Sequence, residues 1–214
     1  MHFEIPVEDQ SGKRMLDVLV PRILGSEHSF RIFAYKGLGR IPRGMKGEID
    51  PAKRVLLDRL RDALPGYSRS LDHATSAVIV VCDLDARCLK AFRGELLAML
   101  NDCDPRLPIR FCIAVEEGGA WLLGDPQAAR SAYPKARQQV LRDYENDAIC
   151  GTWEILAEAV YPGGPAALKT QGVSAAGAEK SRWAEAIAPH IDPERNQSPS
   201  FHYFRGKLRE LSGG

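Results

Sequence analysis

The fold of this chain is decided by one stretch of its sequence, Ala77-Val78-Ile79-Val80-Val81-Cys82-Asp83-Leu84-Asp85. Its first part is an unbroken apolar run rich in β-branched residues, which is typical of a strand buried on both faces of a parallel sheet. The run ends in Asp83 and Asp85. Open α/β folds bind their ligands at the carboxyl ends of parallel strands, and Mg²⁺ prefers carboxylate oxygens. We therefore predict a metal-binding pair. The alternative is that one aspartate only caps the helix that follows.

On either side of this stretch, segments with the pattern of a strand alternate with segments whose apolar residues have the spacing of a helix. The other predicted strands are 2–8, 30–35 and 108–115, and the predicted helices are 11–25, 51–64 and 86–100. Strands that alternate with helices imply right-handed βαβ units and a mostly parallel sheet. Pro6 fits best near an edge or a bulge, because proline lacks an N–H group. Pro65-Gly66 is expected to end the second helix.

The pattern changes after residue 120, where only helices and loops are expected. The third predicted helix has an inner apolar face that includes Leu89 and Leu97. We predict an α/β fold with a mostly parallel, Rossmann-like sheet flanked by helices over residues 1–120. A helical C-terminal part, residues 121–214, is expected to pack on it. The length of 214 residues suffices for a sizeable core.

Composition excludes several classes of protein. The 29 basic and 28 acidic residues are balanced, which argues against a protein coated with nucleic acid but allows a local basic patch. An apolar run long enough to span a membrane is absent from the sequence, and the N-terminus lacks the pattern of a signal peptide. The five cysteines form no Cys-x-x-Cys pair, so neither a disulfide framework nor a zinc site is expected. We expect a protein of the reducing cytoplasm.

Two more predicted strands end in acids. The first is followed by Glu8 and Asp9, and the fourth by Glu116 and Glu117. Acids at the same edge of one sheet repel each other and require a cation to offset their charge. Clusters of this kind hold Mg²⁺ or Mn²⁺ in metal-ion phosphoryl chemistry. Alternatively, some of these acids are helix N-caps that interact with the helix dipole.

A basic, glycine-rich loop follows the second strand at 36–47. Its cations include Lys36, Arg40 and Arg43, and it contains no acid before residue 48. Glycines allow close approach of backbone to a ligand, and cations suit a phosphate backbone. We expect this loop to bind the phosphates of a nucleic acid. The alternative is an exposed loop with scattered charge.

The order of these features resembles the TOPRIM arrangement, in which a glutamate follows strand one and an Asp-x-Asp follows strand three. More closely, the chain resembles a bacterial family known as domain of unknown function 4276. The matching pieces are Val7-Glu8, Tyr35-Lys36-Gly37-Leu38-Gly39-Arg40, Val81-Cys82-Asp83-Leu84-Asp85, Ile113-Ala114-Val115-Glu116-Glu117, Ala120-Trp121-Leu122-Leu123-Gly124-Asp125-Pro126 and Ser198-Pro199-Ser200-Phe201.

The resemblance implies that Glu8, Asp83 and Asp85 are the metal ligands. Gly12 stands where members of the family carry a further acid. The resemblance also implies an ATPase as partner protein and a role in phage defence.

These observations favour a metal-dependent nuclease that hydrolyses DNA or RNA. Glu116 would be a fourth ligand or the base that orients water, and Lys36 and Arg40 would neutralise the scissile phosphate. The alternative is a non-catalytic regulatory or sensor subunit that docks on an ATPase. A third reading, nucleotidyl transfer, shares the metal site.

Overall fold

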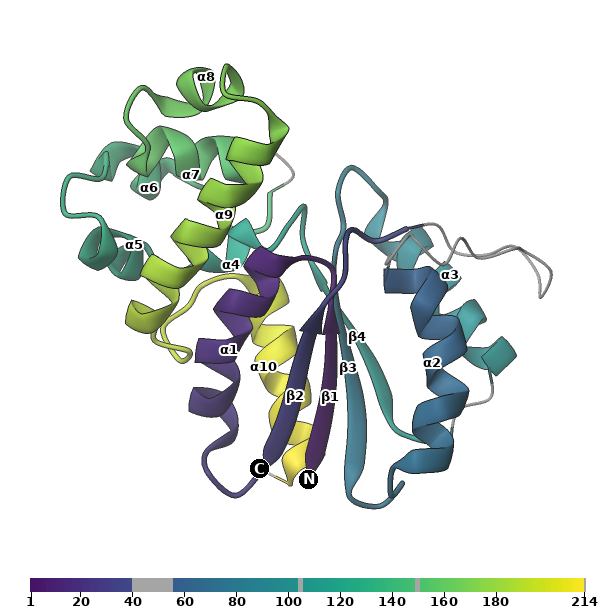
Figure 1. Cartoon of the computed structure of the whole chain (residues 1–214). Coiled ribbons are helices and arrows are strands. Elements are labelled where there is room, and N and C mark those ends of the chain that lie inside the picture. The colour runs from purple at the N-terminus through teal and green to yellow at the C-terminus, as the bar shows by residue number, and fades with distance from the viewer. Residues whose placement is uncertain (40–55, 104–105, 149–150, 214) are drawn as a thin grey trace.

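The centre of the molecule is a parallel sheet with helices on both faces (Figure 1). The computed structural model describes residues 1–39, 56–103, 106–148 and 151–213. Within them the strands are β1 (His2–Val7), β2 (Ser29–Ala34), β3 (Ser76–Asp83) and β4 (Ile109–Ala114). They form one sheet in the order β2-β1-β3-β4, and each pair is parallel. The predicted α/β fold with a parallel sheet is confirmed.

The apolar run that decides the fold forms β3, an inner strand. Residues 77–82 are all buried, and their side chains alternate between the two faces of the sheet. Ala77, Ile79 and Val81 contribute to one core cluster, and Val78 and Val80 contribute to the other. This alternation follows from the two-residue repeat of a strand. It explains why a continuous apolar run is required here.

Each face of the sheet is covered by a pair of helices. Helices α1 (Gln10–Leu24) and α10 (Pro199–Ser212) lie on one face, and α2 (Leu56–Ser70) and α3 (Leu89–Cys103) lie on the other (Figure 1). Helix α10 contacts both β4 and α1, so the end of the chain returns to the sheet.

The remaining helices lie beside α1, near the carboxyl ends of the strands (Figure 1). They are α4 (Gly119–Leu123), α5 (Pro126–Ala132), α6 (Gln138–Asp143), α7 (Thr152–Val160), α8 (Gly164–Lys169) and α9 (Val173–Ile187), followed by a 3-10 turn at Ala188–His190. Their buried residues belong to the same core cluster as β1 and α1. Trp121 stacks on Phe204 at a centroid distance of 5.0 Å, and its indole N–H donates to Ser200 Oγ at 2.8 Å. We call residues 119–190 the helical region.

Pro6 lies in an inner strand, although proline was expected near an edge or a bulge. The N–H of His2 donates to the carbonyl of Thr75 next to β3, so strand alternation directs the N position of Pro6 toward β3 as well. The pairing of β1 with β3 is interrupted at Ile5 and Pro6. The sheet therefore tolerates the missing donor through a local gap in one ladder.

Two predictions about helices are wrong in detail. Helix α2 continues through Pro65 to Ser70, because Leu64 is buried and Tyr67 packs against the same core, which offsets the backbone hydrogen bond that proline cannot make. Helix α3 begins at Leu89 instead of residue 86, and it buries only part of the predicted face. Leu89 and Leu97 remain 44% and 43% exposed.

Among the described residues, no helix is both long and apolar enough to cross a membrane.

Candidate functional site

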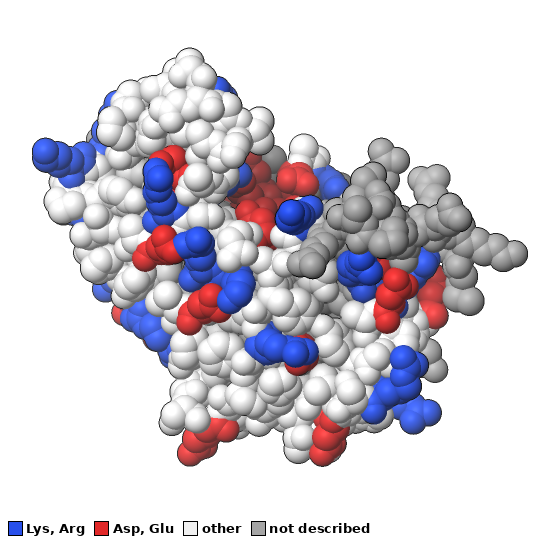
Figure 2. Space-filling view, viewed as in Figure 1, with Lys and Arg blue, Asp and Glu red and all other residues white. Residues whose placement is uncertain are grey.

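Acidic side chains gather at the carboxyl ends of β1, β3 and β4. Figure 2 shows them in a hollow between the helical region and the end of the sheet, with basic side chains beside them. Asp83 is the last residue of β3, and Glu8 directly follows β1. Parallel pairing places these two ends at the same level, because Val7 is the register partner of Val81. The sheet thus brings together two of the acids that the sequence singled out.

Asp83 and Glu8 are in direct contact. The carboxylate of Glu8 accepts a hydrogen bond from the backbone N–H of Asp83 at 3.0 Å, and Asp83 Oδ1 accepts one from the N–H of Gly118 at 3.0 Å. Burial raises the pKa of Glu8 to about 7, and the charge of Asp85 contributes to the rise. Burial also raises the pKa of Asp83 well above its usual range, and the charge of Glu8 raises it further. Both carboxyl groups are therefore costly to ionise without a nearby cation.

On the side of Asp83 that faces the helical region lie Asp9, Glu117 and Lys180. Asp9 is the N-cap of α1 and accepts the N–H of Gly12 at 2.7 Å. The ammonium group of Lys180, from α9, forms an ion pair with Glu117. Burial lowers the pKa of Lys180, but the charge and hydrogen bond of Glu117, together with the charges of Asp83 and Asp9, outweigh this effect, so the pKa lies above its usual value. Burial raises the pKa of Glu117 although Lys180 opposes it.

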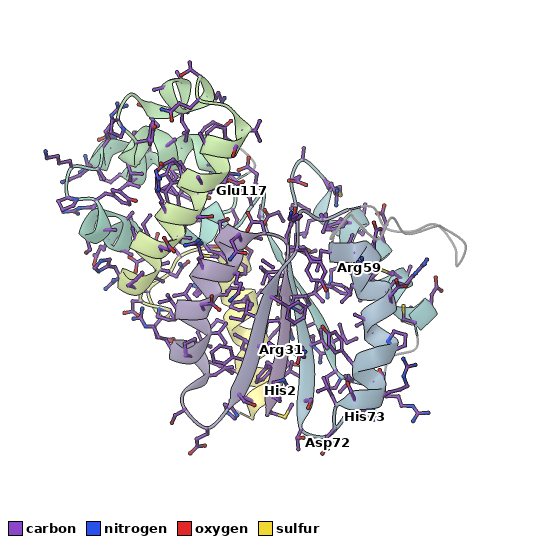
Figure 3. All side chains as sticks on the ribbon, viewed as in Figure 1. His2, Arg31, Arg59, Asp72, His73 and Glu117 are labelled. Carbon is purple, nitrogen blue, oxygen red and sulfur yellow. The ribbon has the colours of Figure 1, made fainter. Side chains whose placement is uncertain are left out.

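These side chains enclose a cavity of about 20 Å³, which is lined by Asp9, Asp83, Glu117 and Lys180 among others. A cavity of this size holds about one water molecule or one ion of similar size. One oxygen of Glu117, Oε1, is buried without a hydrogen-bond partner among the described residues. Figure 3 shows Glu117 where the helical region meets the end of the sheet. The cavity therefore has room and an open acceptor for a small polar ligand.

Asp85 and Glu116 adopt left-handed backbone conformations, with φ of 50° and 62°. They are joined by a hydrogen bond of 2.8 Å from the N–H of Asp85 to the carbonyl of Glu116. Residues other than glycine rarely adopt such angles, and strained backbone of this kind clusters at functional sites. The ends of β3 and β4 are thus linked to each other by strained backbone.

The side chain of Glu116 points away from this cluster. Its carboxylate accepts the N–H of Gly151 at 2.9 Å and both the N–H and the hydroxyl of Thr152, at the start of α7. Glu116 therefore serves as a cap for α7, and Glu117 is the acid after β4 whose charge acts on Asp83. The assignment of Glu116 as a ligand or a base therefore stays a prediction, and Glu117 is the acid after β4 that lines the cavity described above.

The predicted phosphate-binding residues are only partly described. Lys36 is exposed in the turn that follows β2. This turn lies against Glu8, because the N–H of Gly37 donates to the carbonyl of Glu8 at 3.0 Å. Arg40 and Arg43 lie outside the described residues. Of the basic loop, the structure therefore places only Lys36 near the acids.

The sequence analysis did not identify Lys180 as a residue of the site, although the spacing of α9 contains a signal for it. It lies three, four and seven positions before Trp183, Ala184 and Ile187, which are the buried residues of α9. This spacing puts Lys180 on the buried stripe of the helix. A lysine on such a stripe requires an acidic partner, and only the tertiary structure identifies that partner as Glu117.

The donor set suits a hard divalent cation, since it consists of carboxylate oxygens around a small polar cavity. As the side chains stand, no group of three or more His, Cys, Asp or Glu residues in the described part of the chain is arranged to hold a metal ion. Lys180 supplies a positive charge in the same place. The chemistry of these residues therefore fits Mg²⁺ or Mn²⁺, and Lys180 competes with such an ion for the acids.

No protein family, no curated protein and no solved structure matches this chain.

Proposed function

We propose that this protein is a metal-dependent nuclease of the TOPRIM-like type that hydrolyses phosphodiester bonds in DNA or RNA with Mg²⁺ or Mn²⁺. The observation that carries the proposal is the position of Asp83. Its partly buried carboxylate ends the inner strand β3, lies among the acids Glu8, Asp9 and Glu117, and has a strongly raised pKa. Perturbed carboxyl groups at the carboxyl end of a parallel sheet favour a catalytic role over a structural one.

Glu8, Asp83 and Asp85 are the proposed metal ligands, and Glu117 takes the place first assigned to Glu116. A bound divalent cation would supply Lewis-acid chemistry, activating water and stabilising the leaving oxygen. Lys36 would bind a phosphate oxygen of the substrate from the neighbouring turn.

The cellular setting is also part of the proposal. The resemblance to domain of unknown function 4276 suggests an ATPase as partner and a role in phage defence. The cysteines in the described part of the chain, Cys82, Cys88, Cys103 and Cys112, are free thiols, which is compatible with a reducing cytoplasm.

A second candidate is a non-catalytic regulatory or sensor subunit that docks on an ATPase. The position of Lys180 favours it, because an ammonium group that already offsets the charge of Glu117 reduces the need for a metal. The capping role of Asp9 favours it too, since a carboxylate that accepts the N–H of Gly12 has fewer lone pairs for a metal.

The decisive experiment incubates the purified protein with plasmid DNA, single-stranded DNA and transfer RNA in Mg²⁺ or Mn²⁺. We expect cleavage of at least one substrate, and a loss of at least about a hundredfold in Asp83→Ala, because the metal contributes several kcal/mol of transition-state stabilisation. The matched control is Asp72→Ala, which removes an acid at the opposite end of the sheet (Figure 3). Full activity in Asp83→Ala would exclude the assigned site. Absence of cleavage with every substrate would favour the regulatory role.

A further inference from the structure

An apolar groove lies at the free edge of β4, away from the acidic cluster. This groove of about 660 Å³ runs along the edge between α3 and α10. Leu89 and Leu97 from α3, Phe111 and Ile113 from β4, and Tyr203 from α10 provide its apolar lining.

The walls of the groove are unusually exposed for apolar side chains. Leu89, Leu97 and Tyr203 are 44%, 43% and 38% exposed, and they are three of the four large apolar side chains that the described part of the chain exposes in this way. The sequence predicts Leu89 and Leu97 as part of a buried helix face, yet α3 turns them toward the groove. A contiguous exposed apolar surface marks an interaction site more often than a single exposed residue does.

The floor of the groove is the unpaired backbone of an edge strand. The carbonyls of Pro108 and Ala114 accept hydrogen bonds from Val78 and Leu84 on the β3 side. Because the direction of these groups alternates along a strand, the N–H and C=O groups of Phe111 and Ile113 point to the free edge. In the part of the chain that the structure describes, β4 pairs with β3 alone.

Side chains close both ends of this edge. The guanidinium of Arg110 donates to the carbonyl of Ile109 at 3.1 Å, and the hydroxyl of Ser200 accepts the N–H of Val115 at 3.5 Å. Natural proteins protect exposed edge strands because such edges pair with other chains. Here the protection is limited to the ends, and it leaves Phe111 and Ile113 open between them.

The charge on the rim indicates the chemistry of the partner. Lys90 and Arg93 line the groove from α3 and are exposed, and neither forms an ion pair with any described residue. Asp147, which is the one acid among the described residues of the lining, already accepts hydrogen bonds from Ser198 and Ser200. A symmetric pairing of β4 with a second copy would bring the two α3 helices together and oppose their cations. An acidic partner is therefore favoured over a second copy.

We propose that β4 binds an extended segment of a partner protein as an added strand, and that the side of this segment that faces α3 carries both apolar and acidic residues. Its backbone would pair with Phe111 and Ile113. On the side that faces α3, its apolar side chains would contact Leu89 and Leu97 and its acids would reach Lys90 and Arg93, whereas the alternate side chains would face Tyr203 on α10. Strand addition derives affinity from main-chain hydrogen bonds and specificity from pockets for alternate side chains.

The test uses fluorescein-labelled peptides of about six residues, a typical strand length, in which the alternate side chains that would face α3 include both isoleucine and glutamate. Fluorescence polarisation with the full chain is expected to show saturable binding. N-methylation of the alternate amides that face β4 should abolish it, whereas N-methylation of the other amides should preserve it, because only one set joins the ladder. Equal effects of both methylation patterns, or no binding at millimolar peptide, would overturn the proposal.

Variants of the protein test the groove itself. Leu97→Asp and the double variant Lys90→Glu, Arg93→Glu should each weaken binding about tenfold or more without changing the far-ultraviolet circular dichroism, since these side chains are exposed. Arg69→Glu, a charge reversal on the exposed surface of α2, is the matched control and should bind as the wild type does. Unchanged binding in both groove variants, or binding that is replaced by concentration-dependent dimerisation, would overturn the assignment.

Discussion

Glu4 and Asp83 are both acids on inner strands of the same sheet, but the side chains around them differ: Glu4 is paired with a cation, and Asp83 lies among other acids. The side chain of Glu4 is 3% exposed and accepts hydrogen bonds from Arg31 at 2.9 and 3.0 Å and from His2 at 3.1 Å. Arg31 is its register partner on β2, so the adjacent strand supplies the cation. Figure 3 shows His2 and Arg31 well below Glu117, away from the carboxyl ends of the strands.

Among the described residues, Asp83 has no such partner of its own. It accepts one backbone N–H, and its near neighbours are other acids, while Lys180 is already paired with Glu117. A buried charge that is paired and hydrogen-bonded is compatible with a structural role. A group of partly buried acids that share one cation is costly to the fold, and such a cost persists where it serves a function. The comparison therefore separates a structural acid from candidate functional ones.

The largest effect on stability is expected from breaking the structural pair. Arg31→Met removes the main cation of Glu4 and leaves a buried carboxylate with only His2 as a side-chain partner. We expect the free energy of unfolding to fall by about 2 to 3 kcal/mol, because Glu4 is buried and loses its main hydrogen-bond donor, although Arg31 itself is 65% exposed. Urea denaturation measures this change. A loss below about 0.5 kcal/mol would show that the pair behaves like an ordinary surface salt bridge.

The acidic cluster is expected to respond to pH in the opposite way to a stabilising ion pair. Glu8 has a pKa of about 7 in the folded protein against an ordinary value of 4.5. Between these pH values the folded state binds more protons than the unfolded state, so the free energy of unfolding falls as the pH rises. The expected loss is about 2 kcal/mol.

Thermal unfolding between pH 5 and pH 8 in the presence of a chelator measures this loss. Glu8→Gln removes the titrating group and should flatten the pH dependence. An equally steep curve in Glu8→Gln would assign the effect to other groups.

Metal binding should stabilise the cluster and leave the structural pair unaffected. Binding to the folded state alone raises the apparent stability by about 1 to 3 kcal/mol at a large excess of ligand. For a chain of this size that corresponds to an increase in Tm of a few degrees. We expect Mn²⁺ or Mg²⁺ to produce this increase in the wild type and in Asp72→Ala, but not in Asp83→Ala. An equal increase in all three proteins would place the metal elsewhere.

The smallest expected effect distinguishes the two acids that follow β4. Glu116→Gln weakens the hydrogen bonds at the start of α7 and should cost about 1 kcal/mol of stability without changing the response to metal. Glu117→Gln removes the partner of Lys180 inside the cluster and should change the response to metal instead. Isothermal titration with Mn²⁺, together with urea denaturation of both variants, measures both quantities. A reversed pattern would restore Glu116 to the site.

The sequence was sufficient to predict the strands, the type of sheet and the edge at which its acids lie. The apolar run at residues 77–82 predicts a buried inner strand because both faces of β3 require apolar side chains. The alternation of strand and helix patterns predicts the parallel sheet, and strand ends at one edge predict that Glu8 and Asp83 lie together. The spacing of apolar residues shows which face of a helix or strand is apolar. Here this information was enough to predict the architecture.

Only the tertiary structure identified the contacts between residues that are far apart in the chain. The ion pair of Glu117 with Lys180, the capping of α7 by Glu116 and the exposure of Leu89 and Leu97 all depend on how helices pack after they form. Periodicity assigns a side chain to a face of its own helix but does not specify what that face meets. The sequence by itself thus determined the sheet and the edge that carries its acids, whereas long-range packing decided which acid is paired, which caps a helix and which remains available.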